Sequence, residues 1–352
     1  MRRLHWAFVI SCLVWALSTS AVKAQQGETV DSLFASDEIL EVRIVAPIDV
    51  IIKERPIEEQ IAGTFFYTAS DGKSVELDVG IRARGLFRRR ADVCPFPPLR
   101  LNFKKSQLKN SLFAGQDKLK LVTHCRTGSY VLEQAVIAEF LAYRILNLLT
   151  DTSFRVKLLR IDYASTNDDR GINGYALLIE HKDRLAQRIG VPVLTVDEIG
   201  ISEVQADYLN LTSVFQYLIG NTDYSPITTT PDQDCCHNYT PFGSENKPYY
   251  SIPYDFDMSG LVAAPYATPN AKLRLSSVQE RLYRGFCVNN DLLPATVEKF
   301  QAKRDDIEGL IRDQAELSRS KRNEMLGFID AFYRTIARTK SIDRYLVKRC
   351  RS

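Results

Sequence analysis

Alternating apolar and polar residues predict β-strands over residues 39–123. Within residues 74–84 every second side chain is apolar, a spacing typical of a strand with one buried face. The turn at residues 70–73 leads into this segment and predicts a hairpin. Shorter alternations occur at residues 99–103 and 119–121. The first part of the chain is therefore expected to be rich in β-structure.

Helical spacing follows this β-rich part. Ser129 is expected to cap a helix that ends near Leu149 and is apolar almost all round, so this helix should be largely buried. A hairpin is expected from two strands at residues 155–163 and 174–181, followed by an apolar helix at residues 202–219. A strand is expected at residues 249–254 and an amphipathic helical end at residues 292–352. This order predicts an α+β protein.

The N-terminus has the pattern of a signal peptide, expected to span residues 1–24. A basic start is followed by an apolar run at residues 6–17, too short to span a bilayer, and by a small-x-small site at residues 22–24. An alternative is a lipoprotein cleavage box at residues 9–12, which leaves little apolar sequence before the cut. No later run approaches about 18 apolar residues, so we expect no transmembrane segment after signal removal. Residues 25–38 are polar and expected to be loose.

Signal removal takes away Arg2, Arg3 and Lys23 and no acid, which lowers the formal net charge from +3 to zero. A neutral protein is a poor general binder of polyanions, so we expect no nucleic-acid partner. Basic clusters nevertheless remain at residues 82–90 and in the last twenty residues.

An even number of cysteines would remain after signal removal, which predicts disulfides in an exported protein, periplasmic or extracellular. They are Cys94, Cys125, Cys235, Cys236, Cys287 and Cys350. We favour Cys94–Cys125, because each lies near a predicted strand in the same half of the chain. The pairing of the other four stays open, although adjacent Cys235 and Cys236 are expected to reach different partners. Zinc binding is the alternative, but no Cys-x-x-Cys spacing occurs.

Two short polar segments carry the densest candidate chemistry. The first contains Asn221-Thr222-Asp223 and then His237-Asn238, and the second contains Asp255-Phe256-Asp257. Each places acids directly after apolar structure, where a helix or strand ends at the edge of the core. Carboxylate oxygens suit Mg²⁺, which binds one or two of them and keeps its other coordination positions for phosphate and water. The plainer interpretation is that these residues form turns. Phosphatases that use an aspartyl nucleophile also carry Asp-x-Asp, but this interpretation is disfavoured. Their motif normally opens the domain and has Thr or Val two residues later, whereas this pair lies past the middle of the chain and has Ser259 at that position.

Together these motifs resemble the spore-coat protein H (CotH) family of atypical kinases. The family pattern has Arg-Gly after a strand, Gly-Tyr-x-x-x-x-Glu, Asn-x-Asp, His-Asn and Asp-x-(Asp/Glu). This chain has Arg84-Gly85, then Gly174-Tyr175 followed by Glu180, and then the two polar segments, all in the same order. The resemblance covers roughly residues 75–260.

The resemblance implies a two-lobed protein-kinase-like fold over residues 39–352, with a β-rich N-terminal lobe (39–181) and a mainly helical C-terminal lobe (182–352). It also implies phosphate transfer from ATP to a hydroxyl on an unknown acceptor, either a protein or a small molecule, with Mg²⁺ or Mn²⁺.

The resemblance also assigns roles to single residues. Asp223 would be the catalytic residue that takes the proton of the acceptor hydroxyl. Asn238, Asp255 and Asp257 would hold the metal. The expected nucleotide-binding residues are Arg84, Gly85, Lys120, Glu139 and Glu180. Of these, Lys120 would pair with Glu139 and hold phosphates, and Glu180 would border the adenine.

An alternative function is a catalytically inactive binding or structural module of the cell envelope. The chain has Phe96-Pro97-Pro98-Leu99 where related kinases carry a Lys-Lys segment, and only Arg100 could replace that charge. Glu139 could instead pair with an arginine, Lys120 could be a solvated strand residue, and His124 and His237 are expected to form hydrogen bonds. Residues 88–90, three consecutive arginines, are expected to form a solvated loop, with an acidic substrate as the alternative partner.

Overall fold

The computed structural model describes residues 32–166, 171–229, 234–244 and 248–352. Asp31–Ser352 forms one compact unit. The predicted signal peptide, residues 1–24, and residues 25–31 of the segment expected to be loose lie outside the described residues. At the start of the described chain, Ser32–Phe34 forms a short 3-10 helix whose Leu33 and Phe34 side chains are buried.

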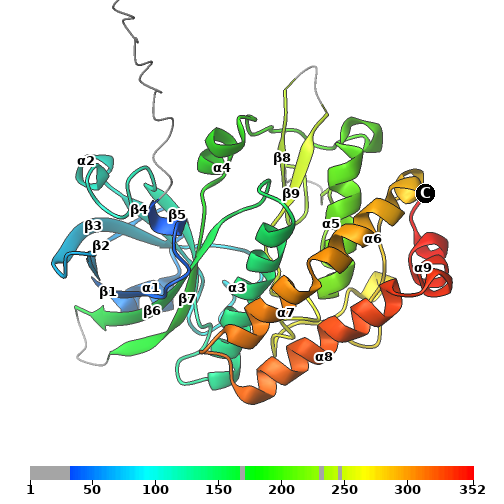
Figure 1. The fold of residues 1–352 in the computed structure, drawn as a ribbon. Coiled ribbons are helices and arrows are strands. Elements are labelled where there is room, and N and C mark those ends of the chain that lie inside the picture. Colours follow the sequence, from blue (N-terminus) through cyan, green and yellow to red (C-terminus); the bar gives the residue numbers. More distant parts are fainter. Residues whose placement is uncertain (1–31, 167–170, 230–233, 245–247) are drawn as a thin grey trace, which may run out of the picture. The chain divides into compact units, whose positions relative to one another are not determined.

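Seven strands close into a barrel in the order β1-β2-β3-β4-β5-β7-β6, drawn from blue to green in Figure 1. Neighbouring strands are antiparallel except β1 and β6, which pair in parallel from Leu40 opposite Leu159. The barrel strands are β1 (Leu40–Ala46), β2 (Ile61–Thr68), β3 (Ser74–Ala83), β4 (Leu99–Phe103), β5 (Lys118–Val122), β6 (Val156–Ser165) and β7 (Ile172–Ile179).

The expected two-lobed protein-kinase-like fold is therefore wrong. Strands of the N-terminal half close into a mixed barrel, and the helices lie mainly in the C-terminal region. The physical reason is the pairing of β1, which is antiparallel to β2 on one side and parallel to β6 on the other. Both edges of β1 are thus hydrogen-bonded, and closure leaves the sheet without a free edge.

The predicted strands owe their form to the alternation of their side chains. In β3, Leu77, Val79 and Ile81 are buried, while the residues between them face outward. Their apolar face joins a core inside the barrel in which Phe65 and Phe113 pack edge to face. The hairpin predicted for residues 155–181 is also present as β6 and β7. The strand predictions for β3 to β7 are confirmed.

Three helices, α1 to α3, lie between barrel strands in the chain order, and the other helices follow the barrel together with a two-stranded sheet. The helices are α1 (Ile48–Glu54), α2 (Lys105–Leu108), α3 (Tyr130–Leu149), α4 (Lys182–Ile189), α5 (Ala206–Ile219), α6 (Leu293–Ala302), α7 (Arg304–Asp313), α8 (Arg319–Ile336) and α9 (Thr339–Tyr345); the small sheet pairs β8 (Tyr239–Phe242) with β9 (Tyr250–Pro253). The predicted helices near residues 129–149 and 202–219 are confirmed, as is the helical end.

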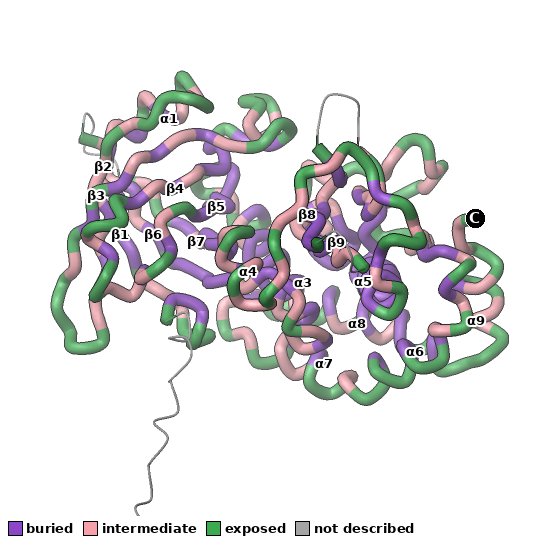
Figure 2. The backbone as a smooth tube through the Cα atoms, turned by 90° about the horizontal axis from the view of Figure 1, so that it is seen from above, coloured by how far each residue is buried: buried purple, intermediate pink, exposed green. Residues whose placement is uncertain are grey.

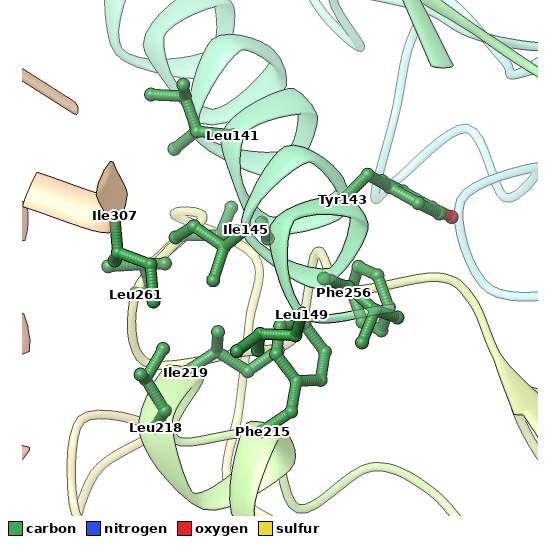
Figure 3. Packing of buried hydrophobic residues seen from close by; sticks show 14 of the residues in the cluster. Leu141, Tyr143, Ile145, Leu149, Phe215, Leu218, Ile219, Phe256, Leu261 and Ile307 are labelled. Carbon is green, nitrogen blue, oxygen red and sulfur yellow. The ribbon is translucent and has the colours of Figure 1, made fainter. Parts of the chain in front are cut away.

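Helix α3 packs against barrel strands β6 and β7 on one side and against α7 on another. Figure 3 shows Ile145 of α3 together with Phe215 of α5, Ile307 of α7 and Leu261, which follows β9. All four side chains are fully or almost fully buried. Figure 2 shows much of the backbone of α3 and α5 as buried. Because α3 is apolar almost all round, it can serve as the shared core between barrel and helices.

Three disulfides link the six cysteines of residues 94–350. Cys94–Cys125 confirms the favoured pairing, and Cys287 pairs with Cys350. Cys235 and Cys236 pair with each other, so the expectation that they reach different partners is wrong. These bonds fit a protein that folds in an oxidising compartment outside the cytoplasm, and they leave none of the six thiols for zinc. Among the described residues, no helix is long and apolar enough to cross a membrane.

Candidate functional site

Asp223 is positioned by the end of helix α5. The helix ends at Gly220, which has a φ of +64°, and a Cβ there would lie 2.7 Å from the ring of Phe328. Glycine is therefore favoured at this position for both conformation and space. Beyond it the side-chain oxygen of buried Asn221 accepts a hydrogen bond from the backbone N–H of Asp223 at 2.9 Å. The Asn-x-Asp motif is thus a local turn that orients Asp223.

Both carboxylate oxygens of Asp223 have partners. Oδ1 lies 2.8 Å from Nε2 of His237, and Oδ2 accepts a hydrogen bond from Nδ2 of Asn238 at 3.1 Å. Asn238 has a φ of +56° and also donates to the backbone oxygen of Asp223 at 2.7 Å. The hydrogen bond with Asp223 raises the pKa of His237. The expected hydrogen-bonding role of His237 is confirmed. The His-Asn motif thus orients Asp223 of the Asn-x-Asp motif through hydrogen bonds.

Asp255 and Asp257 follow strand β9 and are fixed from the core side. Phe256 between them is fully buried, with its ring centroid 4.5 Å from that of Tyr143 and 5.3 Å from that of Phe215 (Figure 3). Asp255 has a φ of +62°, and its backbone N–H donates to the hydroxyl of Tyr143 at 2.8 Å. Non-glycine residues rarely adopt this left-handed backbone conformation, and those that do often lie at functional sites.

Arg88 joins the acidic residues of the site. Its side chain is 8% exposed and contacts three carboxylates: Nη1 lies 3.4 Å from Glu139, Nη2 lies 2.7 Å from Asp255 and Nε lies 3.2 Å from Asp257. Three consecutive arginines at residues 88–90 predict a solvated loop. This prediction is wrong for Arg88, whereas Arg90 is mostly exposed and pairs with Asp92.

This cluster carries more negative than positive charge, since one guanidinium faces three carboxylates. Burial raises the pKa of Glu139, and Asp257 and Asp255 add to the shift against the opposing effect of Arg88. Burial likewise raises the pKa of Asp257. Burial also opposes ionisation of Asp255, but Arg88 and other nearby cations outweigh it and lower its pKa. In addition, Oε1 of Glu139 is buried without a hydrogen-bond partner.

Most of the predicted site residues line one cavity of about 470 Å³. Its predicted members are Arg84, Gly85, Lys120, Asp223, Asn238, Asp255 and Asp257. Arg88, His237 and Tyr254 also line it, and the ammonium of Lys120 lies 4.0 Å from the ring centroid of Tyr254. The structure therefore brings together residues as far apart in sequence as Arg84 and Asp257.

Glu139 and Glu180 are placed differently from the other predicted residues. Glu139 pairs with Arg88 instead of Lys120, and it is absent from the lining of this cavity. Glu180 lines a neighbouring cavity of about 310 Å³, which also contains Lys120 and Tyr254. Both carboxylate oxygens of Glu180 accept hydrogen bonds from Arg188, at 3.1 and 2.8 Å. Its side chain thus anchors helix α4.

The cavity contains oxygen donors of the types that divalent cations take in proteins. Among the described residues, no group of three or more His, Cys, Asp or Glu side chains is arranged to hold a metal. The candidate ligands in the lining are the carboxylates of Asp255 and Asp257 and the amide of Asn238. Mg²⁺ is commonly held by one or two carboxylates with water and phosphate completing its shell. The excess negative charge around Arg88 favours such a cation.

A comparison of the sequence with protein-family models and with curated proteins found no match.

Proposed function

We propose that this chain is an exported, periplasmic or extracellular phosphotransferase, which moves the γ-phosphoryl group of ATP to a hydroxyl on a protein or small molecule. The supporting observation is that Asp223, Asn238, Asp255 and Asp257, from two separate segments, line one cavity with Arg84 and Lys120. All of these residues except Lys120 belong to motifs on which the resemblance to CotH kinases rests.

In this proposal Asp223 orients the acceptor hydroxyl and takes its proton. The hydroxyl oxygen bonds to the γ-phosphorus, the bond from that phosphorus to the bridging oxygen breaks, and ADP leaves. His237 and Asn238 support this role because they hold the carboxylate of Asp223 in one orientation. Positioning and neutralisation of charge are the main contributions of a protein to phosphoryl transfer.

Asn238, Asp255 and Asp257 would hold Mg²⁺ or Mn²⁺, which neutralises phosphate charge when bound. Arg84, Gly85 and Lys120 would face the phosphates, since they line the same cavity. Gly85 has a φ of +81° and no atom near its missing Cβ, so the backbone is open there. The adenine would lie in the neighbouring cavity, near the end of β7 and the aromatic ring of Tyr254.

One observation favours the second candidate function, an inert binding or structural module of the envelope. Arg88 already contacts Asp255 and Asp257, so part of the charge available to a metal is neutralised within the protein. A buried ion cluster of this kind can serve structure alone.

The two functions are separated by thermal melting of the oxidised protein with and without Mg²⁺ and ATP. Under the phosphotransferase proposal, ligand at about 100 times its dissociation constant stabilises the protein by about 2.7 kcal/mol, and Asp255→Asn weakens this effect. Asp223→Asn should keep nucleotide binding and lose transfer, measured by ADP release with an added acceptor. No stabilisation at millimolar nucleotide would favour the inert module.

A further inference from the structure

Three basic side chains lie side by side on the outer face of the barrel. In the strand register Arg82 of β3 lies opposite Arg100 of β4, and Arg100 lies opposite Lys120 of β5. Register partners on antiparallel strands project from the same face, so the three side chains form a row. Arg84 lies two residues after Arg82, just past the end of β3, and acts electrostatically on Arg100 and Lys120. Like charges directly opposite each other destabilise a sheet unless something neutralises them.

Arg82 and Arg100 have little neutralisation from the protein, whereas Asp255 interacts electrostatically with Arg84 and Lys120. Within the described part of the chain, no carboxylate forms an ion pair with Arg84, Arg100 or Lys120, and Arg82 reaches only the exposed Glu58 at 4.0 Å. Several other outward cations of the same barrel are paired. Arg43 lies 3.4 Å from Asp162, for example. The row is therefore a local excess of positive charge.

The surroundings of the row are also cationic. Arg100 and Lys120 line the smaller cavity together with His181 and Lys182. Glu180 in this cavity is already neutralised by Arg188, which leaves Asp234 as the other acid of its lining. Burial lowers the pKa of Arg100 and also that of Lys120, and Arg84 adds to both shifts. An anion beside these side chains would offset their mutual repulsion.

We infer that Arg82 and Arg100, the two cations of the row outside the cavity proposed for the ATP phosphates, bind an oxyanion carried by the acceptor, such as a phosphate or a chain of phosphates, while Arg84 and Lys120 face the nucleotide. This inference rests on the proposed function and specifies its acceptor. Arg82 lines neither cavity, so the row extends along the barrel beyond the space proposed for the nucleotide. Arginine forks match phosphate geometry, and charge-assisted hydrogen bonds supply the affinity.

The probe is inorganic tripolyphosphate, titrated calorimetrically into the oxidised protein without its signal peptide at low ionic strength. We expect Arg100→Gln and Arg82→Gln each to weaken binding about tenfold, the effect of one charge-assisted contact. The matched control is Arg43→Gln, which removes a paired cation from the same barrel. The melting temperature of ligand-free Arg100→Gln should equal or exceed that of the parent, because one repulsive contact is removed.

A second titration, with Mg²⁺ and a non-hydrolysable ATP analogue at saturation, separates the two sources of phosphate. Retained tripolyphosphate binding supports an oxyanion on the acceptor, whereas displacement overturns that assignment and places the row on the nucleotide tail. The row is not a binding site if tripolyphosphate does not bind or if all three variants lose affinity equally. ATP stabilisation without tripolyphosphate binding would overturn this inference alone, and absence of both would overturn the proposed function as well.

Discussion

Replacing Arg88 with methionine should lower the free energy of unfolding by about 3 to 5 kcal/mol, the usual cost of removing one partner from a buried ion cluster. The variant would leave Glu139, Asp255 and Asp257 close together without their shared cation. Two of these side chains are less than one tenth exposed, so water can replace little of the lost interaction. Urea unfolding of the oxidised protein at neutral pH measures the change.

Arg90→Met is the matched control, because Arg90 lies in the same loop but its side chain is 59% exposed and pairs with Asp92. This control should change stability by no more than about 0.5 kcal/mol. Adding Glu139→Gln to Arg88→Met removes a buried carboxyl group that has lost its cation and should restore part of the loss. If Arg88→Met unfolds at the same urea concentration as Arg90→Met, the cluster contributes little to stability and its charges are screened.

Local patterns in the sequence were sufficient to predict most of the strands and helices. The alternation at residues 74–84 predicts β3 because a strand with one buried face must repeat every two residues. The apolar surface of α3 likewise predicts its burial. Closure of the barrel depends on the parallel pairing of β1 with β6, which are far apart in sequence. No local pattern encodes that register, so the fold class was predicted wrongly.

The candidate site was predictable to the extent that its residues lie in short motifs. Asn221, Asp223 and Asn238 are joined by hydrogen bonds, and this agrees with their grouping in the sequence. Arg88 could not be recognised, because a run of three arginines resembles a solvated loop and its partners lie far away in the chain. Of the two partners considered for Glu139, an arginine is confirmed and Lys120 is not, but the sequence does not tell which arginine. Long-range ion pairs leave no periodic signal.

Gly174 shows how a motif residue can owe its identity to packing. A Cβ on Gly174 would lie 3.1 to 3.2 Å from the ring atoms of His124. His124 is fully buried, with its ring centroid 4.8 Å from that of Phe96 and 6.0 Å from that of Tyr163. Its Nε2 lies 3.3 Å from the hydroxyl of Thr127, and its Nδ1 has no hydrogen-bond partner. The ring is thus held neutral in an apolar setting.

Burial lowers the pKa of His124 from 6.5 to about 4, so acidification should destabilise the protein through this residue. The unfolded chain binds the proton near pH 6.5 and the folded one only near pH 4. The contribution of the neutral ring to the free energy of unfolding is therefore fully present above pH 6.5. It is lost between pH 6.5 and 4, by about 3 kcal/mol in total. Unfolding curves of the parent and of His124→Gln across this range isolate the effect. The parent should lose about 3 kcal/mol more than the variant; parallel pH profiles would mean that the buried ring is protonated in the folded protein without cost.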